Sequence, residues 1–316
     1  MNTHLKEGIK AQRRRGAKYF RTLFLLLYIS LFLTGCGRMA VSNIPGRVFT
    51  DALERNVPLP DHPERIVSLA PAVTEILYAL NLEERIVGVT DYCNYPLQAA
   101  GVTRVGGYTN PNLERLCSLK PDLVLAMHGI SKSMVGQIER AGLAVVTLHP
   151  TDLEGLYNMI KDIGYITGNR VEAATLCISL QKRRQAVSDM VAEAPHPSVF
   201  YVIWDEPLFT AGSGTFINDI IIAAGGRNIA AGIKGYVQFS REQLLAKDPD
   251  IILYSDKIKL YEKMKRDRVW RRLKAVRSGC IYPLNEDIIS RPGPRLLDSL
   301  EEVASLIHPD HDRKAR

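Results

Sequence analysis

The sequence places aromatic and histidine side chains where predicted strands end. His128 and His149 each follow a short apolar run typical of a buried strand, and open α/β sheets bind ligands at the carboxyl ends of their strands. Aromatic residues also lie in loops or at strand ends: Tyr92, Tyr95, Tyr108, Trp204, Phe209 and Tyr236. Gathered at one sheet edge they would form a shelf for a flat ligand, whereas in separate turns they would be half-buried supports. Either histidine could likewise flank a helix without a role in binding.

The sequence lacks the motifs of common catalytic sites. We find no GxSxG, no HExxH and no phosphate-binding loop. Gly212 and Gly214 open a predicted helix, but the full GxGxxG and the acid that should follow it are missing. Arg291 and Arg295, in the segment RPGPR, could bind a carboxylate or a phosphate, and Arg295 could instead neutralise Asp298 or another nearby acid. The pattern favours a binding site over an enzyme, and it predicts no catalytic residue and no resident cofactor.

One helix–strand unit occurs twice and carries an acid at the same place. The segment NLERLCSLKPDLVLAM begins with the helix cap Asn112, so Glu114 falls in the first turn, where the helix dipole favours negative charge. In SREQLLAKDPDIILYS, Ser240 takes the cap position, Gln243 can complete a capping box, and Glu242 again lies two residues after the cap. In both copies a Pro-Asp pair ends the helix and leads into an apolar strand. Repetition after 128 residues (242 minus 114) predicts two similar lobes.

Predicted strands alternate with predicted helices over most of the chain, which indicates parallel α/β sheets. The strand signals fall at 65–70, 85–90, 123–127 and 143–149, and they resume at 199–204, 251–255 and 280–285. We therefore expect an N-terminal α/β lobe at 63–151 and a C-terminal α/β lobe at 196–316.

The segment 152–195 interrupts this alternation and has no strand signal. A helix is predicted from Val171 to Val191, roughly 30 Å long at the standard rise per residue. Its apolar residues lie toward both ends, while its centre, QKRRQ, is polar. We expect a bridge between the lobes that is anchored at its ends and solvated in the middle; an ordinary surface helix of one lobe is the alternative.

The net charge of the chain belongs to its first residues. The whole sequence carries +7, and residues 1–35 hold seven Lys or Arg against one Glu, a local sum of +6. The remainder is close to neutral, which argues against a nucleic-acid partner. A basic start followed by the short apolar run 23–33 is typical of an export signal peptide, because the run is too short to span a bilayer.

The end of this leader resembles the bacterial lipobox. The four residues Leu33-Thr34-Gly35-Cys36 fit a pattern in which the cysteine is lipidated and becomes the new N-terminus. We therefore expect an exported protein, in the periplasm or on the outer cell surface, anchored to a membrane by Cys36; a plain exported protein is the alternative. Residues 36–62 contain several Gly and Pro and are predicted to be a flexible tether.

Four cysteines follow Cys36, namely Cys93, Cys117, Cys177 and Cys280. An exported protein could pair them, but the pairing cannot be deduced from their positions. Their spacing does not fit a zinc site, so no metal site is predicted.

Several separated motifs together resemble one protein family. The segments ERIVSLAPAVTEILYAL, VGGYTNPNLERLCSLKPDLVLA, IWDEPLFTAGSGTFINDIIIAAGG and RPGPRLLDSLEEVA occur in the order seen in the binding proteins of ABC importers for cobalamin, ferric siderophores and haem. The resemblance covers residues 65–308. It implies two α/β lobes joined by one long helix, with the ligand in the cleft between them. It also implies a permease dimer with its ATPase as partner, and docking of Glu114 and Glu242 into arginine pockets of that two-fold permease.

The ligand implied by the resemblance is cobalamin or a related corrinoid. Tyr108 lies where cobalamin-binding relatives carry an aromatic residue, and Tyr92 and Trp204 occupy comparable cleft loops; Phe209, His128 and Arg291 complete the expected ligand set. Thr147 and the Met127-His128 pair depart from the pattern, since tryptophans can occur there. His128 could instead be an axial ligand to haem or to cobalt. A haem or ferric-siderophore receptor, a chelate-processing enzyme and a sensor without a permease are the alternatives.

Overall fold

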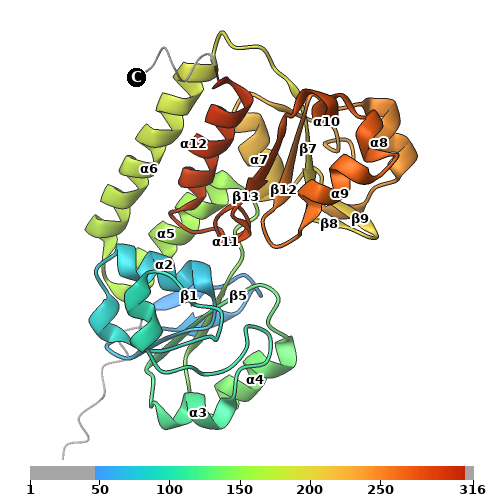
Figure 1. Ribbon diagram of the computed structural model, residues 1–316. Helices are drawn as coiled ribbons and strands as arrows, with labels where there is room; N and C mark the ends of the chain where they lie inside the picture. Colours follow the sequence, from blue (N-terminus) through green and yellow to red (C-terminus); the bar gives the residue numbers. More distant parts are fainter. Residues whose placement is uncertain (1–46, 310–316) are drawn as a thin grey trace, which may run out of the picture. The chain divides into compact units, whose positions relative to one another are not determined.

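Two parallel sheets organise residues 47–309, the part of the chain that the computed structural model describes (Figure 1). The first sheet has the order β4-β3-β5-β6, with strands Ile86–Val89, Ile66–Ser68, Leu123–Met127 and Val145–Leu148. The second has the order β10-β7-β12-β13, with strands Arg227–Asn228, Ser198–Val202, Ile251–Ser255 and Ile281–Leu284. The predicted two-lobed α/β fold is confirmed. The expected signal peptide, Cys36 and the first part of the tether lie outside the described residues.

Helices flank both sheets, and their ends follow local sequence signals. The first lobe has α2 (Pro71–Ala79), α3 (Leu113–Ser118), α4 (Lys132–Arg140) and the 3₁₀ turns η1 (Glu83–Arg85) and η2 (Leu97–Gly101). The second lobe has α7 (Phe216–Ala223), α8 (Arg241–Lys247), α9 (Leu260–Arg266), η3 (Trp270–Arg272), α10 (Lys274–Ser278), α11 (Glu286–Ile289) and α12 (Leu296–Ile307). Helix α2 starts with proline, and side-chain oxygens cap α3, α4, α7 and α8. Within residues 47–309, no helix combines the length and the apolarity that crossing a bilayer requires.

The repeated unit takes the same form in both lobes. It is α3 followed by β5 in the first lobe and α8 followed by β12 in the second. In the first copy the carboxylate of Asp122 accepts the main-chain N–H of Glu64 at 2.7 Å, just before β3. In the second copy Asp250 accepts the N–H of Ser198 at 2.8 Å, at the start of β7. Each aspartate therefore fastens the unit to the neighbouring strand of its own sheet.

Helices α5 (Leu153–Thr167) and α6 (Arg170–Val191) connect the two lobes. Arg85 of the first lobe donates to the carbonyl of Thr167, just before α6 begins, whereas Val191 at its other end lies against Gly225 of the second lobe. A Cβ on Gly164 would lie 2.4 Å from that of Ala173, so a glycine is required where α5 and α6 cross. The bridging helix is confirmed.

The centre of α6 differs from the expectation of a solvated middle. Leu180 is 3% exposed, and Arg183 donates to Asp298 and Glu301 of α12, at 2.7 Å each. The polar run QKRRQ predicted a solvated centre, but one of its arginines pairs with acids more than a hundred residues later in the chain. The sequence pattern alone does not indicate such a distant pairing. The helix therefore packs against the second lobe along its centre as well.

Part of the expected tether is folded. Residues 48–50 (β1) and 56–58 (β2) form an antiparallel hairpin on the first lobe. Asp51, only 5% exposed, accepts the N–H of Thr147 at 3.1 Å and pairs with Arg55, which also reaches the carbonyl of Val145. The Gly and Pro residues of segment 36–62 predicted a flexible tether. The buried ion pair between Asp51 and Arg55 instead fixes the β1–β2 hairpin to β6.

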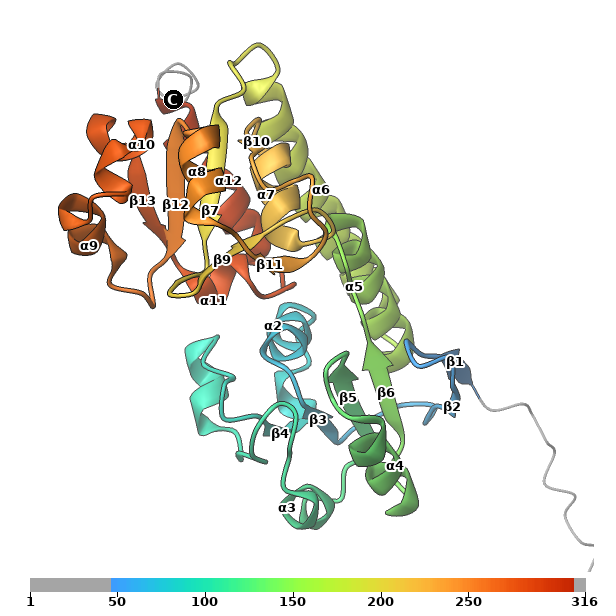
Figure 2. The same cartoon turned by 90° about the vertical axis from the view of Figure 1, so that its right-hand side faces the viewer.

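A third, antiparallel sheet was not predicted. It has the order β11-β9-β8, with strands Tyr236–Gln238, Leu208–Ala211 and Trp204–Asp205. The apolar run 199–204 reads as one strand, but β7 stops at Val202 and the chain turns back at residues 206–207. Figure 2 shows this sheet on the side of the second lobe that faces the first lobe.

Candidate functional site

The second lobe offers an aromatic wall to the cleft between the lobes. Trp204, Phe209 and Tyr236, one from each strand of the antiparallel sheet, line a cavity of about 230 Å³ together with Ile203 and Ile217. Trp204 is 52% exposed and Tyr236 is 56% exposed. Burial raises the pKa of the Tyr236 hydroxyl, so this group stays neutral near pH 7. The wall can cover a flat apolar face, and the Glu286 side chain lines the same cavity, so a carboxylate lies beside the aromatic rings.

The first lobe brings Tyr108 and the two histidines together. The Tyr108 hydroxyl donates to the carbonyl of His128, and the rings of His128 and His149 stack with centroids 4.0 Å apart and 16° between their planes. Both histidines are exposed. Partial burial and the neighbouring His128 lower the pKa of His149, which favours its neutral form. A neutral, exposed imidazole such as that of His149 can donate a hydrogen bond or coordinate a metal.

The loop after β4 carries the two exposed tyrosines of the first lobe. Tyr92 is 60% exposed and Tyr95 is 45% exposed. Between them, Asn94 donates to Asp287 of the second lobe at 2.9 Å. One face of the Tyr95 ring is covered by the Arg295 guanidinium, 3.8 Å from the ring centroid. Of the two rings, Tyr92 is therefore the freer to meet a ligand.

Arg291, an expected ligand residue, makes contacts within the protein. Its guanidinium donates to the side chain of Asn94 at 2.7 Å and to the carbonyl of Tyr92 at 3.4 Å, and it pairs with Asp287 at 3.1 Å. These contacts join α11 and the segment that follows it in the second lobe to the 91–96 loop of the first. In this structure Arg291 therefore holds the lobes at the base of the cleft and orders the loop that carries Tyr92.

Arg295 makes a largely buried contact between the lobes. It donates to both carboxylate oxygens of Glu75, at 2.6 and 2.9 Å, and the Glu75 side chain is only 2% exposed. The sequence reading left Asp298 or another acid as the partner of Arg295, and the structure selects Glu75. Glu75 was missed, although a lone acid inside the apolar helix PAVTEIL was a signal for a buried ion pair.

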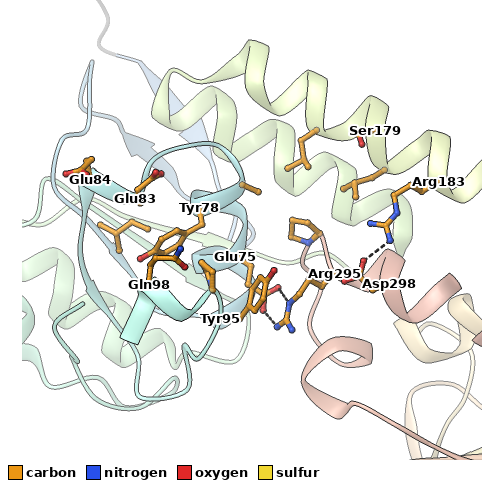
Figure 3. A pocket seen from close by; sticks show the side chains of 16 residues that line it. Glu75, Tyr78, Glu83, Glu84, Tyr95, Gln98, Ser179, Arg183, Arg295 and Asp298 are labelled. Carbon is orange, nitrogen blue, oxygen red and sulfur yellow. Dashed lines mark hydrogen bonds and ion pairs between the residues drawn. The ribbon is translucent and has the colours of Figure 1, made fainter. Parts of the chain in front are cut away.

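A larger cavity lies beside this ion pair (Figure 3). It measures about 870 Å³, and α2, the 95–98 loop, α6 and α12 form its walls. Glu75, Tyr95 and Arg295 line it, but it includes none of the aromatic residues Trp204, Phe209 and Tyr236. The cavity beside the aromatic wall of the second lobe and this larger cavity are therefore separate features.

Glu114 and Glu242 are both exposed in the first turns of their helices, α3 and α8. Asn112 caps α3, and the predicted capping box of Ser240 and Gln243 is present in α8. Neither glutamate has an ion-pair partner among residues 47–309. Both carboxylates are thus rigidly presented and available to an external partner.

The described residues contain no group of three or more potential metal ligands. Cys93, Cys117, Cys177 and Cys280 are all free, so none of them is joined in a disulfide. Cys93 is buried and lies within hydrogen-bonding distance of the hydroxyls of Thr74 and Thr90. In this part of the chain the cysteines act as packing residues.

Two lobes joined by a helix, with open aromatic walls facing a cleft, define a solute-binding protein of the kind that serves membrane importers. The chain belongs to the periplasmic binding protein family, whose profile matches residues 66–288. It is 33% identical over 302 residues to the ABC transporter substrate-binding lipoprotein YvrC of Bacillus subtilis, covering 90% of this chain and 96% of that relative. Its relatives are substrate-binding proteins of ABC transporters and not enzymes.

Solved structures agree with this assignment. The periplasmic vitamin B12-binding protein BtuF of Vibrio cholerae superposes with a TM-score of 0.69 at 30% identity, covering 78% of this chain and 97% of that one. The periplasmic haem-binding protein RhuT of Roseiflexus sp. RS-1 gives a TM-score of 0.72 at 26% identity, covering 78% and 99%.

Proposed function

We propose that this protein is a lipid-anchored receptor that binds cobalamin or a related corrinoid and delivers it to an ABC importer. The observation that carries the proposal is the aromatic wall of the second lobe, where Trp204, Phe209 and Tyr236 line one cavity, together with the exposed ring of Tyr92 in the first lobe. A corrin ring is broad and flat, and stacking on exposed aromatic faces suits it. The names of the Vibrio cholerae relatives, vitamin B12-binding proteins, support the same ligand.

The anchor rests on the sequence Leu33-Thr34-Gly35-Cys36 and on the name of the relative YvrC, which is a lipoprotein. Lipidation of Cys36 would hold the receptor at the membrane, close to its importer. Some ten residues, 37–46, would then separate the anchor from the folded hairpin β1–β2. Such a short link keeps the receptor at a high effective concentration near a partner in the same membrane.

Equilibrium binding of cyanocobalamin to the full chain in detergent tests the ligand assignment. We expect an affinity in the micromolar range or tighter for the wild type, and about a tenfold loss for Trp204→Ala, since burying one aromatic side chain contributes about 1.4 kcal/mol or more. Tyr261→Ala is the matched control, because Tyr261 is an exposed aromatic on α9 that lines neither wall of the cleft. No binding of any corrinoid at micromolar concentration would refute the proposal.

A haem receptor is the second candidate, and the stacked pair of His128 and His149 favours it. One of these imidazoles could coordinate iron, as His does in many haem proteins. The absorption spectrum after exposure to each chelate separates the two candidates. Haem coordinated by histidine would lose its spectral shift in the His128→Ala, His149→Ala double variant, whereas a corrinoid held by the aromatic walls would remain bound.

A further inference from the structure

In each lobe one short segment joins a cleft aromatic to an exposed acid. Tyr108 precedes Glu114 by six residues, and Tyr236 precedes Glu242 by six residues. The aromatic of each pair belongs to a wall of the cleft, and the acid is exposed in the first turn of the next helix. The same short segment therefore contacts the ligand at one end and carries the docking acid at the other.

In the second lobe the main chain ties this segment to the cleft hairpin formed by β8 and β9. Tyr236 of β11 lies opposite Ala211 of β9. Three residues after Tyr236, the main-chain N–H of Phe239 donates to the carbonyl of Leu208 at 2.8 Å. Phe239 is 3% exposed and packs against Phe200, so the segment cannot slide over the lobe. Helix α8, with Glu242, starts directly after this anchored residue.

Ion pairs tie the tip of the same hairpin to α8 and α9. Arg241, the residue before Glu242, pairs with Glu206 at 3.1 Å and with Asp267 at 3.5 Å. Lys263 of α9 pairs with Asp205 at 2.5 Å and with Glu206 at 3.0 Å. Both acids of the hairpin tip are thus neutralised by the two helices.

The hairpin tip also contacts the cleft tryptophan. Asp205 and Glu206 follow Trp204 directly, and the Trp204 indole N–H donates to the carbonyl of Glu206 at 2.9 Å. A ligand that moves the Trp204 ring therefore moves the acceptors of Arg241 and Lys263.

The first lobe has no equivalent network in the described residues. Arg115, which follows Glu114, donates to the main-chain carbonyl of Arg104 at 3.1 Å, and Tyr108 donates to a carbonyl as well. These contacts fix main-chain positions without an ion pair between the cleft wall and α3. The network around Arg241 and Lys263 is therefore a property of the second lobe and not a general requirement of the repeated unit.

We propose that Arg241 and Lys263 are positioning residues that hold the β8–β9 hairpin and the start of α8 as one rigid unit, through which a ligand against Trp204 changes how Glu242 is presented. The inference rests on the proposed function. A single exposed ion pair contributes little, but here three ion pairs from two cations converge on one short hairpin, and a fourth ties Arg241 to Asp267 at the end of α9. Without them the hairpin would absorb the displacement, and α8 would not follow it.

Hydrogen exchange of the full chain tests the mechanical part without ligand or permease. We expect Arg241→Gln and Lys263→Gln each to raise amide exchange at least threefold in peptides covering both 204–209 and 239–243. Lys265→Gln is the matched control, because Lys265 lies on the same helix α9, its ammonium lies over the ring of Tyr261, and it has no ion pair among residues 47–309. Unchanged exchange in both peptides in both variants would overturn the proposal.

The second measurement compares affinity for the permease–ATPase complex with and without saturating cyanocobalamin. We expect at least a fivefold difference for the wild type and for Lys265→Gln, as is usual for coupled sites. In the Arg241→Gln, Lys263→Gln double variant the difference should fall below twofold, while cyanocobalamin affinity stays within threefold of the wild type. A double variant that keeps the wild-type difference, or a wild type without one, would overturn the proposal.

Failure of the proposed function has a different signature. The wild type would then not bind cyanocobalamin, or Glu242→Ala would leave its affinity for the permease unchanged. In either case the exchange measurement still decides whether the hairpin and α8 behave as one unit.

Discussion

Single side chains decide how the two lobes are held. Glu75 and Arg295 form a two-point contact with almost no exposure of the acid, and Arg291 adds a second cation at 3.6 Å. Removing one partner of a buried pair costs far more than removing an exposed charge, because the remaining charge stays out of water. The exposed acids that line the same cavity, Glu83 and Glu84, have no such partner among residues 47–309.

Glu75→Ala should therefore lower the free energy of unfolding by about 3 kcal/mol. For a folded region of this size, that corresponds to a fall of roughly 6–12 °C in the melting temperature. Glu84→Ala is the matched control and should change stability by less than about 0.5 kcal/mol, as expected for an exposed site. Thermal and urea unfolding of the full chain measure both; equal losses in the two variants would contradict the role of Glu75.

At the scale of elements, the repeated unit explains why so much of the fold was predictable. Helical spacing, caps and the Pro-Asp stop are local signals, and β5 and β12 were predicted with the bounds that the structure has. Asp250, the aspartate of the second Pro-Asp pair, shows how this residue stabilises the fold. Burial alone would raise its pKa, but hydrogen bonds from Lys274 and Ser198 outweigh burial and lower the pKa to about 2. The ionised carboxylate therefore stabilises the folded state.

The sign of the pH effect follows from this shift. The pKa of Asp250 is lower in the folded than in the unfolded state, so its contribution is complete above about pH 4 and disappears as the pH falls toward 2. We expect Asp250→Asn to be less stable than the wild type at pH 6, by up to about 1 kcal/mol because the ion pair is partly exposed, and the difference to shrink between pH 4 and pH 2 as Asp250 becomes protonated. Asp61→Asn, an exposed site, should show no such pH dependence. Urea unfolding between pH 6 and pH 2 is the measurement; a difference that grows with acidity would contradict it.

The elements that sequence reasoning missed depend on distant partners. The β1–β2 hairpin is fixed by Asp51 and Arg55 against β6, ninety residues away, and strands this short carry no periodic signal. The sheet β11-β9-β8 has strands of two to four residues and was hidden at the end of an apolar run. In the candidate site, Tyr92, Tyr108, Trp204 and Phe209 were predicted from their places in loops and strand ends. The interlobe contacts of Asn94, Asp287 and Glu75 were not, because nothing local pairs them.

At the scale of the whole molecule, the two lobes share one core and carry one exposed acid each. A single apolar cluster includes Leu77 and Ile160 on one side and Ile220 and Leu300 on the other. A shared core limits how far the lobes can move as whole bodies, so changes in the distance between Glu114 and Glu242 are limited to local shifts of α3 and α8 within their lobes. Two rigidly spaced acids suit a two-fold permease that offers two basic pockets, because complementary charges set the register of such an interface.

The Glu114→Ala, Glu242→Ala double variant should keep its affinity for cyanocobalamin and lose at least tenfold in uptake by cells. The reason is that both carboxylates lie outside the cleft walls, in first turns of helices. The control is Glu172→Ala with Glu262→Ala, which removes two other exposed acids from the first turns of α6 and α9. Uptake that survives the first pair of changes would show that the docking assignment is wrong.

The repeated unit places one exposed acid at the same local position in each lobe, while the ion pairs around the two acids differ. A symmetric partner that recognises only the two acids would accept the receptor in either of two orientations related by a half-turn, which doubles the number of productive encounters. The ion pairs of Arg241 and Lys263 exist in only one lobe of the described chain, so the two orientations would not be equivalent once a ligand is bound. The two halves of a symmetric permease would then contact acids that are held differently. Transport would therefore depend on which of the two orientations the receptor adopts when it docks.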